Sequence, residues 1–164
     1  MERLWAPWRL DYITRPKPES CIFCEKPLLG DDRAAYIVHR GEHAFVILNA
    51  FPYNNGHVMV APFAHLADLE ELPPDTLHEM MDLAQLCARA IKQVFRPDGL
   101  NLGLNLGAAA GAGIKDHLHL HVVPRWHGDT NFMPVIGDVR VIPQSLDQSF
   151  TALRAAFQEL TSGA

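Results

Sequence analysis

The sequence predicts an α+β domain with about five short strands, mostly antiparallel, and two helices. Short apolar runs rich in β-branched residues, separated by clusters of turn-forming residues, predict the strands. Two longer segments repeat apolar residues at helical spacing and predict the helices. The chain has 164 residues, of which 48% are hydrophobic and 20% charged, as in an ordinary globular domain.

The predicted strands cover residues 35–39, 44–49, 57–61, 100–106 and 117–123. The first two are separated by a short polar turn and are expected to form a hairpin. The third follows a segment dense in turn formers and ends at Pro62. The fourth alternates leucine with asparagine and glycine, which is typical of a half-buried strand.

The predicted helices begin near residues 74 and 146. The first runs to residue 96, with Asp75 as a candidate N-cap and a Pro-Asp-Gly sequence after its end. Cys87 lies on its apolar face and is expected in the core. In the second helix the apolar residues follow one another in steps of four, three, four and three.

Charge and composition argue against several classes of protein. The formal net charge is −5 and there is no long basic run, which disfavours a nucleic-acid-binding surface. The longest uncharged stretch, residues 99–114, is too short and too rich in Gly and Asn for a membrane span. No secretory signal is visible, and three cysteines do not make a disulfide framework, so we expect a reducing cytoplasm.

Three histidines, His117, His119 and His121, alternate with aliphatic residues. In a strand such side chains share one face at intervals of roughly 6.5–7 Å. A neutral imidazole is a good nucleophile toward phosphorus near neutral pH, because its ordinary pKa is about 6.5. Single histidines are usually structural, but three in this pattern beside a glycine-rich loop favour chemistry. A catalytic metal site is the competing interpretation.

Cys21 and Cys24 form a Cys-x-x-Cys pair surrounded by prolines. A thioredoxin-like redox pair would need a strand before it and a helix after it, and no strand is predicted there. A zinc site fits better, with His65 and His117 as candidates for the two further ligands. Four protein ligands would leave no open position, so the zinc would be structural and His119 would be the nucleophile. Two merely buried cysteines are the remaining alternative.

The motif His117-Leu-His-Leu-His-Val-Val resembles that of the histidine-triad (HIT) superfamily. The resemblance extends to Asn49, to the segment 56–60, to the Pro-Phe-Ala-His corner at residues 62–65, and to Asn105. It implies a HIT-like fold in which two copies pair through the first long helix and an edge strand, forming a sheet of about ten strands. A homodimer is therefore expected.

The resemblance also implies roles for individual residues. His119 matches the histidine that attacks the α-phosphorus of a nucleotide and becomes covalently nucleotidylated. His121 matches a histidine that contacts the phosphate, and His57 matches a supporting histidine in the same cluster. Asn49 matches a ribose-binding asparagine and Asn105 a phosphate-side asparagine. Members with Cys-x-x-Cys bind zinc through positions matching Cys21, Cys24, His65 and His117.

Three further segments resemble one bacterial branch of the superfamily, which includes hydrolases and phosphorylases of diadenosine polyphosphates. They are residues 4–9, residues 21–24 and residues 126–132. The sequence does not distinguish water from phosphate as the acceptor. A nucleotide-binding module with vestigial catalysis is the alternative from another class, and the intact triad argues against it. Magnesium is expected, if at all, with the substrate.

The loop before the triad departs from the family pattern. Many members have a glutamine there, whereas this chain has an Ala- and Gly-rich loop at residues 107–113. Backbone N–H groups near Gly111 and Gly113 could cradle phosphate oxygens instead, or the loop could be a simple tight connection. The departure leaves the nucleophile unchanged and bears on the leaving group.

The whole chain is interpreted as one domain with four parts. They are an N-terminal arm (1–20), a zinc knuckle (21–30), a catalytic core (31–124) and a C-terminal extension with a helix (125–164). Trp5 and Trp8 in the arm are expected to pack on the partner copy or on their own core.

Overall fold

A computed structural model of the chain describes residues 20–129 and 142–162. Nearly all of the predicted N-terminal arm, with Trp5 and Trp8, lies outside the described residues. The last three residues of the segment 126–132, which follows the histidine motif, also lie outside the described residues.

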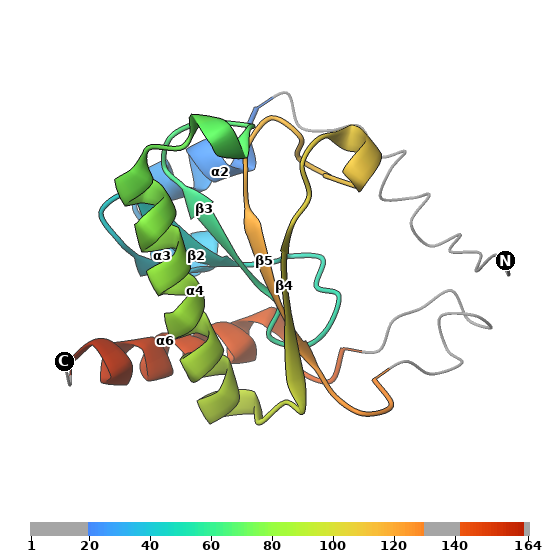
Figure 1. The fold of residues 1–164 in the computed structure, drawn as a ribbon. Coiled ribbons are helices and arrows are strands. Elements are labelled where there is room, and N and C mark those ends of the chain that lie inside the picture. The colour runs from blue at the N-terminus through green and yellow to red at the C-terminus, as the bar shows by residue number, and fades with distance from the viewer. Residues whose placement is uncertain (1–19, 130–141, 163–164) are drawn as a thin grey trace, which may run out of the picture.

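The strands form one five-stranded sheet in the order β1-β2-β3-β5-β4 (Figure 1). Each neighbouring pair is antiparallel. The strands are β1 (Ile37–Arg40), β2 (Ala44–Leu48), β3 (Val58–Pro62), β4 (Gly99–Leu104) and β5 (Leu120–Arg125). The predicted α+β class with a five-stranded antiparallel sheet is confirmed.

The start of β5 differs from the prediction. The ladder between β3 and β5 begins at the pair Val60 and Leu120, so His117 and His119 precede the strand. Before that pair, the Leu118 N–H donates to the carbonyl of Leu66, 2.7 Å away, in place of a ladder bond. The two sides of this segment are nevertheless distinct, because Leu118 and Leu120 join the main core while the histidines face away from it.

Both predicted long helices are present, as α4 (Pro74–Phe95) and α6 (Leu146–Ser162). The predicted N-cap at Asp75 is wrong. Helix α4 begins at Pro74, and Pro73 occupies the cap position without a side-chain hydrogen bond. Proline suits the first helical position because its missing N–H would have no partner inside the helix.

Short helices fill the connections. They are α2 (Ile22–Glu25), η1 (Lys26–Leu29), α3 (Asp32–Ala35), η2 (Leu69–Glu71) and η3 (Ala108–Ala110). The first two form the predicted knuckle, which ends at Gly30 in the left-handed conformation (φ 70°). Asp31 then caps α3 by accepting hydrogen bonds from the N–H groups of Arg33 and Ala34.

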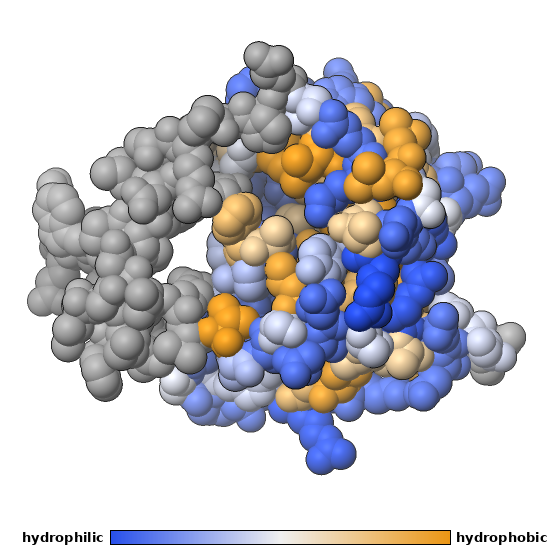
Figure 2. Space-filling view, turned by 180° about the vertical axis from the view of Figure 1, so that it is seen from behind, coloured by the Kyte–Doolittle hydropathy of each residue, from blue (hydrophilic) through white to orange (hydrophobic). Residues whose placement is uncertain are grey.

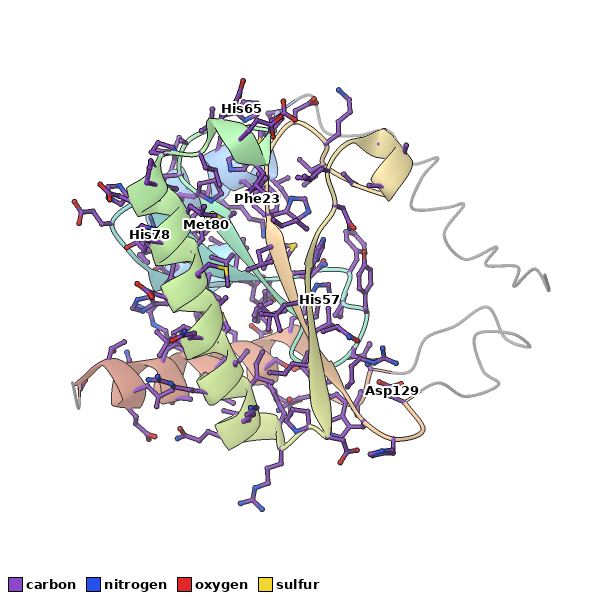
Figure 3. All side chains as sticks on the ribbon, in the orientation of Figure 1. Phe23, His57, His65, His78, Met80 and Asp129 are labelled. Carbon is purple, nitrogen blue, oxygen red and sulfur yellow. The ribbon has the colours of Figure 1, made fainter. Side chains whose placement is uncertain are left out.

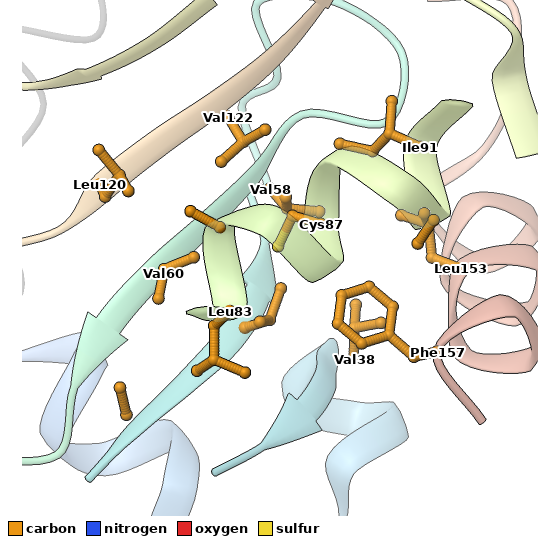
Figure 4. Close-up of a cluster of buried hydrophobic side chains, with 14 of the residues drawn as sticks. Val38, Val58, Val60, Leu83, Cys87, Ile91, Leu120, Val122, Leu153 and Phe157 are labelled. Atoms are coloured by element: carbon orange, nitrogen blue, oxygen red, sulfur yellow. The ribbon is translucent and has the colours of Figure 1, made fainter. Parts of the chain in front are cut away.

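Helices α4 and α6 cover one face of the sheet, where the main core lies (Figures 1 and 4). Val58 and Val122 from the strands meet Ile91 of α4 and Leu153 of α6, and each of these four is completely buried. Cys87 belongs to the same core, as predicted. Burial raises the pKa of its thiol, so Cys87 is a neutral packing group.

The opposite face of the sheet has a smaller apolar cluster, which includes Phe23, Phe45 and Met59. Phe23 belongs to α2, so the knuckle covers one end of this face. Figure 2 shows the molecule from this side, with hydrophobic residues lying among hydrophilic ones. The histidines lie on this face, away from α4 and α6.

No helix in the described part of the chain has both the length and the apolarity that a membrane crossing requires.

The turn between β1 and β2 is held by Glu79 from the first turns of α4. Its carboxylate accepts hydrogen bonds from the backbone N–H groups of Glu42, His43 and Ala44. A Cβ atom on Gly41 would collide with this carboxylate, so the close approach requires glycine there. The interaction joins the helix layer to the hairpin at its tip.

We expect Glu79→Ala to lower the free energy of unfolding by about 2–3 kcal/mol, because it leaves two partly buried N–H groups and one exposed N–H group without their charged acceptor. Urea denaturation measures this change. Asp82→Ala is the matched control, since Asp82 is an exposed carboxylate on the same helix. An equal loss in both variants would contradict the role assigned to Glu79.

Candidate active site and metal centre

Four residues predicted as metal ligands converge at the end of the sheet covered by α2. The candidate ligand atoms of Cys21, Cys24, His65 and His117 all lie within 4.8 Å of one another. Figure 3 shows His65 at this end of the molecule, above Phe23. Three separate segments contribute: the knuckle supplies both thiols, the corner after β3 supplies His65, and the segment before β5 supplies His117.

The distances in this cluster match a tetrahedral zinc site. Zn–S bonds of about 2.3 Å and Zn–N bonds of about 2.0 Å would separate sulfur from nitrogen by about 3.5 Å and two nitrogens by about 3.3 Å. The Nδ1 atoms of His65 and His117 are 3.3 Å apart. Cys24 Sγ lies 3.3 Å from His65 Nδ1 and 3.6 Å from His117 Nδ1. The residues therefore fit a zinc ion.

The chemistry of the donors agrees with this fit. Burial and the neighbouring Cys21 raise the pKa of the Cys24 thiol, so two adjacent thiolates need a cation between them. The Nε2 atom of His117 lies 2.8 Å from the carbonyl oxygen of Pro62, to which only an N–H can donate. The lone pair of His117 is therefore on Nδ1, the atom that faces the cluster.

The backbone fixes the tautomer of His119. Its Nδ1 lies 2.8 Å from the carbonyl oxygen of His117, so Nδ1 holds the proton and Nε2 holds the lone pair. Burial lowers the pKa of His119, which is only 6% exposed, and keeps the ring neutral at physiological pH. Phe23 packs against the ring, with 4.8 Å between centroids. His119 thus has the nucleophilic form of imidazole, held rigidly.

A second chain of hydrogen bonds fixes His57 and His121. The N–H of Tyr53 donates to Nδ1 of His57 at 3.1 Å, and the Asn49 amide nitrogen lies 3.4 Å from the same atom. Nδ1 is therefore an acceptor and Nε2 has the proton, which it donates to Nδ1 of His121 at 2.9 Å. His121 consequently has its own proton on Nε2.

The rings of His119 and His121 are neighbours in complementary hydrogen-bonding states. The centroids of His119 and His121 are 4.9 Å apart and the rings lie at 71°. Burial, together with the nearby His119, lowers the pKa of His121 to about 4, so it stays neutral. One ring thus offers a lone pair and the other an N–H donor. A nucleophile beside a hydrogen-bond donor in a dry site is the arrangement that attack on a phosphoryl group requires.

The predicted residues of the glycine-rich loop are less closely tied to this cluster. Asn105 is half-buried directly after β4. The N–H of Gly111 donates to the carbonyl of Ala108 at 3.0 Å, so it is engaged within the loop. Gly113 is half-buried two residues later. Contact of Asn105, Gly111 and Gly113 with a phosphate stays a prediction.

Two contributors to the site were not predicted from sequence. The ring of Tyr53 packs against both His57 and His121, with centroids 4.7 and 5.7 Å apart. Phe23 packs against His117 and His119. A signal existed for each, because Phe23 lies inside the Cys-x-x-Cys pair and Tyr53 lies four residues before His57.

Comparisons with known proteins show the family of this chain. The HIT domain model matches residues 32–128, which is more than half of the chain. The AP-4-A phosphorylase of Mycobacterium tuberculosis (strain ATCC 25618 / H37Rv) is 43% identical over 155 residues, covering 89% of this chain and 79% of that protein.

Solved structures have the same fold. A Zn-bound histidine triad family protein from Mycobacterium smegmatis superposes with a TM-score of 0.71 at 34% identity, covering 88% of this chain and 98% of that one. A hypothetical histidine triad nucleotide-binding protein from Sulfolobus tokodaii gives a TM-score of 0.68 at 29% identity, over 86% and 94% of the two chains. The chain described here belongs to the histidine-triad, or HIT, family.

Proposed function

We propose that this protein is an enzyme that cleaves a dinucleoside polyphosphate of the diadenosine tetraphosphate type at an α-phosphorus, through a covalent nucleotidyl-His119. The supporting observation is the pair of fixed tautomers, a lone pair on Nε2 of His119 beside an N–H on Nε2 of His121. The 43% identity to an enzyme named AP-4-A phosphorylase supports the class of substrate.

The first step of the proposed reaction is an in-line displacement. The Nε2 lone pair of His119 forms a P–N bond while the bond from the α-phosphorus to the bridging oxygen breaks, and the electron pair leaves with the remaining nucleotide. The N–H of His121 donates to a non-bridging oxygen, where charge accumulates. An acceptor oxygen then forms a new P–O bond, and the electron pair of the broken P–N bond returns to Nε2.

The other predicted residues have supporting roles in this proposal. His57 keeps His121 in its donor tautomer through the 2.9 Å hydrogen bond. Asn49 would bind the ribose, and Asn105 and the N–H of Gly113 would contact phosphate oxygens where many relatives use glutamine. Magnesium would enter only with the substrate's phosphates.

Zinc has a structural role in this proposal. Two thiolates and two imidazoles complete a tetrahedron and leave no position for water or substrate. The ion would clip the knuckle to the segment that holds His117 and His119. A reducing compartment such as the cytoplasm would keep both thiols available for it.

We also propose that two copies pair through β4 and α4. Strand β4 is at the end of the sheet and pairs with β5 alone among the described strands. Its Leu102 is 47% exposed, and Leu77 and Met81 expose apolar surface on α4. Pairing two such edges would extend the sheet and cover these side chains. A single-copy mass in sedimentation velocity would contradict the pairing.

The division of the chain into four parts of one domain also belongs to this proposal. Residues 31–124 would form the catalytic core, with the knuckle at 21–30 bearing the zinc. The arm at 1–20 and the extension at 125–164 would complete one domain, since helix α6 packs on the same core as α4.

Phosphate is the second candidate for the acceptor, in place of water. The relative at 43% identity is named a phosphorylase, which favours it. The alternative of a binding module without catalysis is disfavoured, because a pure binding site has no need of a nucleophilic tautomer on His119.

We expect His119→Asn to lower turnover of diadenosine tetraphosphate on the order of a thousandfold or more, while substrate binding stays within about threefold. Isothermal titration and product chromatography measure the two effects. His78→Asn, at an exposed position on α4, is the matched control and should retain full activity. Full turnover in the His119 variant would exclude the covalent mechanism.

Removing zinc with a chelator should lower the melting temperature by more than about 10 °C. Cys24→Ser should lose the ion, and Cys87→Ala should retain it, because Cys87 lies in the apolar core. Metal analysis and thermal unfolding give the readouts. If the chelated protein kept its melting temperature and lost only its activity, the zinc would be catalytic.

With inorganic phosphate present, diadenosine tetraphosphate should yield ADP and ATP, because phosphate oxygen attacks the nucleotidyl-His119. Without phosphate, slow hydrolysis should yield AMP and ATP. Oxygen-18 supplied in the phosphate should appear in the ADP. Production of AMP and ATP without ADP under both conditions would show that water is the acceptor.

A further inference from the structure

The loop that leads into His57 is tied to the end of β5 by one side chain, Asn54. Its amide nitrogen donates to the carbonyl of Pro124 at 3.0 Å and to the Oδ2 atom of Asp129 at 2.8 Å. Only an NH₂ group can supply both hydrogens, so the orientation of the amide is determined. The strand that ends at this point is the one in which His121 lies.

Asp129 is the anchor of this contact. Arg125 donates to both of its carboxylate oxygens, at 2.6 and 3.0 Å, and the N–H of Trp126 donates at 3.2 Å. Arg125 also donates to Asn101 of β4 at 2.9 Å. The Asp129 side chain is only 10% exposed. These hydrogen bonds, chiefly from Arg125, hold the pKa of Asp129 well below its usual range, so the anchor is charged. Figure 3 shows Asp129 beyond the end of β5 and below His57.

The anchored residue lies beside Tyr53, whose N–H is the nearer of the two nitrogen groups at His57 Nδ1; the Asn49 amide nitrogen is the other, at 3.4 Å. Tyr53, the residue before Asn54, supplies the N–H that donates to His57 Nδ1. The carbonyl of Asn54 accepts from the N–H of His57 at 3.2 Å. A displacement of this turn by about 1 Å would lengthen the Tyr53 hydrogen bond beyond its useful range.

The turn has little other freedom. Gly56 has a positive φ of 75°, and a Cβ atom there would collide with the ring of Phe95 at the end of α4. The turn is therefore held from the helix side by close packing and from the strand side by Asn54. The contact of Asn54 with the end of β5 lies next to the Tyr53 N–H, which donates to Nδ1 of His57.

We propose that Asn54 and Asp129 are positioning residues that hold the Tyr53 N–H on His57 Nδ1 and thereby keep His121 as a donor through Nε2. Without these hydrogen bonds, the His57 tautomer with its proton on Nδ1 would become populated beside the one with its proton on Nε2. His57 would then no longer donate to Nδ1 of His121, and the proton of His121 would no longer be confined to Nε2. The expected effect on catalysis rests on the proposed function, whereas the expected effect on the tautomers of His57 and His121 is independent of it.

The test uses the full-length, zinc-loaded protein with Asn54→Asp, which preserves shape and removes both donors. We expect kcat for diadenosine tetraphosphate to fall about tenfold to a hundredfold, with KM within about threefold. Nitrogen-15 spectra of the imidazoles should show His57 and His121 as Nε2-protonated in the parent protein and as tautomer mixtures in the variant.

Asn55→Asp is the matched control. Asn55 is the next residue in the same turn, and its side chain bonds to Gln144 and Ser149 rather than to Asp129. It should leave kcat and the tautomer signals unchanged. Should Asn54→Asp fail to fold, Asn54→Ser, compared with Asn55→Ser, decides the question without adding a charge.

The proposal is overturned if both Asn54 variants retain kcat and the parent tautomers, or if the Asn55 variants show the same changes. If the parent protein forms no nucleotidyl-His119, the proposed function fails. The nitrogen-15 comparison still decides the positioning role in that case, because it requires no turnover.

Discussion

The rest of the site depends on the contacts of one residue, His117. Its Nε2–H donates to Pro62 at the end of β3, and its Nδ1 faces the cluster of thiols. Its backbone carbonyl accepts the proton of His119 Nδ1. The candidate metal cluster, the sheet and the ring of His119 therefore share one completely buried residue. A displacement of His117 would affect all three.

A backbone acceptor and a backbone donor fix the tautomers of His119 and His121. The carbonyl of His117 fixes His119, and the N–H of Tyr53 fixes His121 through His57. Backbone groups lose little freedom when they make such contacts, because the sheet and the turn already hold them. The site thus obtains a lone pair and a donor from identical side chains. Chemically equal imidazoles acquire different functions from their surroundings alone.

The features that follow from local pattern could be predicted from the sequence. The helical spacing predicted α4 and α6, and short apolar runs between turn formers, two of them alternating, predicted the strands. Ligand chemistry with Cys-x-x-Cys predicted the candidate set Cys21, Cys24, His65 and His117, which the structure brings together. Three other features escaped prediction, two because they depend on contacts between distant segments and one because it is a hydrogen bond from the backbone. They are the late start of β5, the N–H of Tyr53 and the anchor at Asp129. A backbone donor has no side-chain signature, and the Asn54 contact spans 75 residues.

The neutrality of the buried imidazoles has a consequence for how the site treats charge. Burial keeps the pKa of His119 and His121 below the ordinary value, so neither ring is a cation at physiological pH. In the proposed reaction these rings would therefore meet a phosphate through a lone pair and an N–H dipole, without a fixed positive charge. A polyanion held in this way is not trapped by electrostatic attraction. Such a surface suits an enzyme whose departing nucleotide retains most of the negative charge with which the substrate arrived.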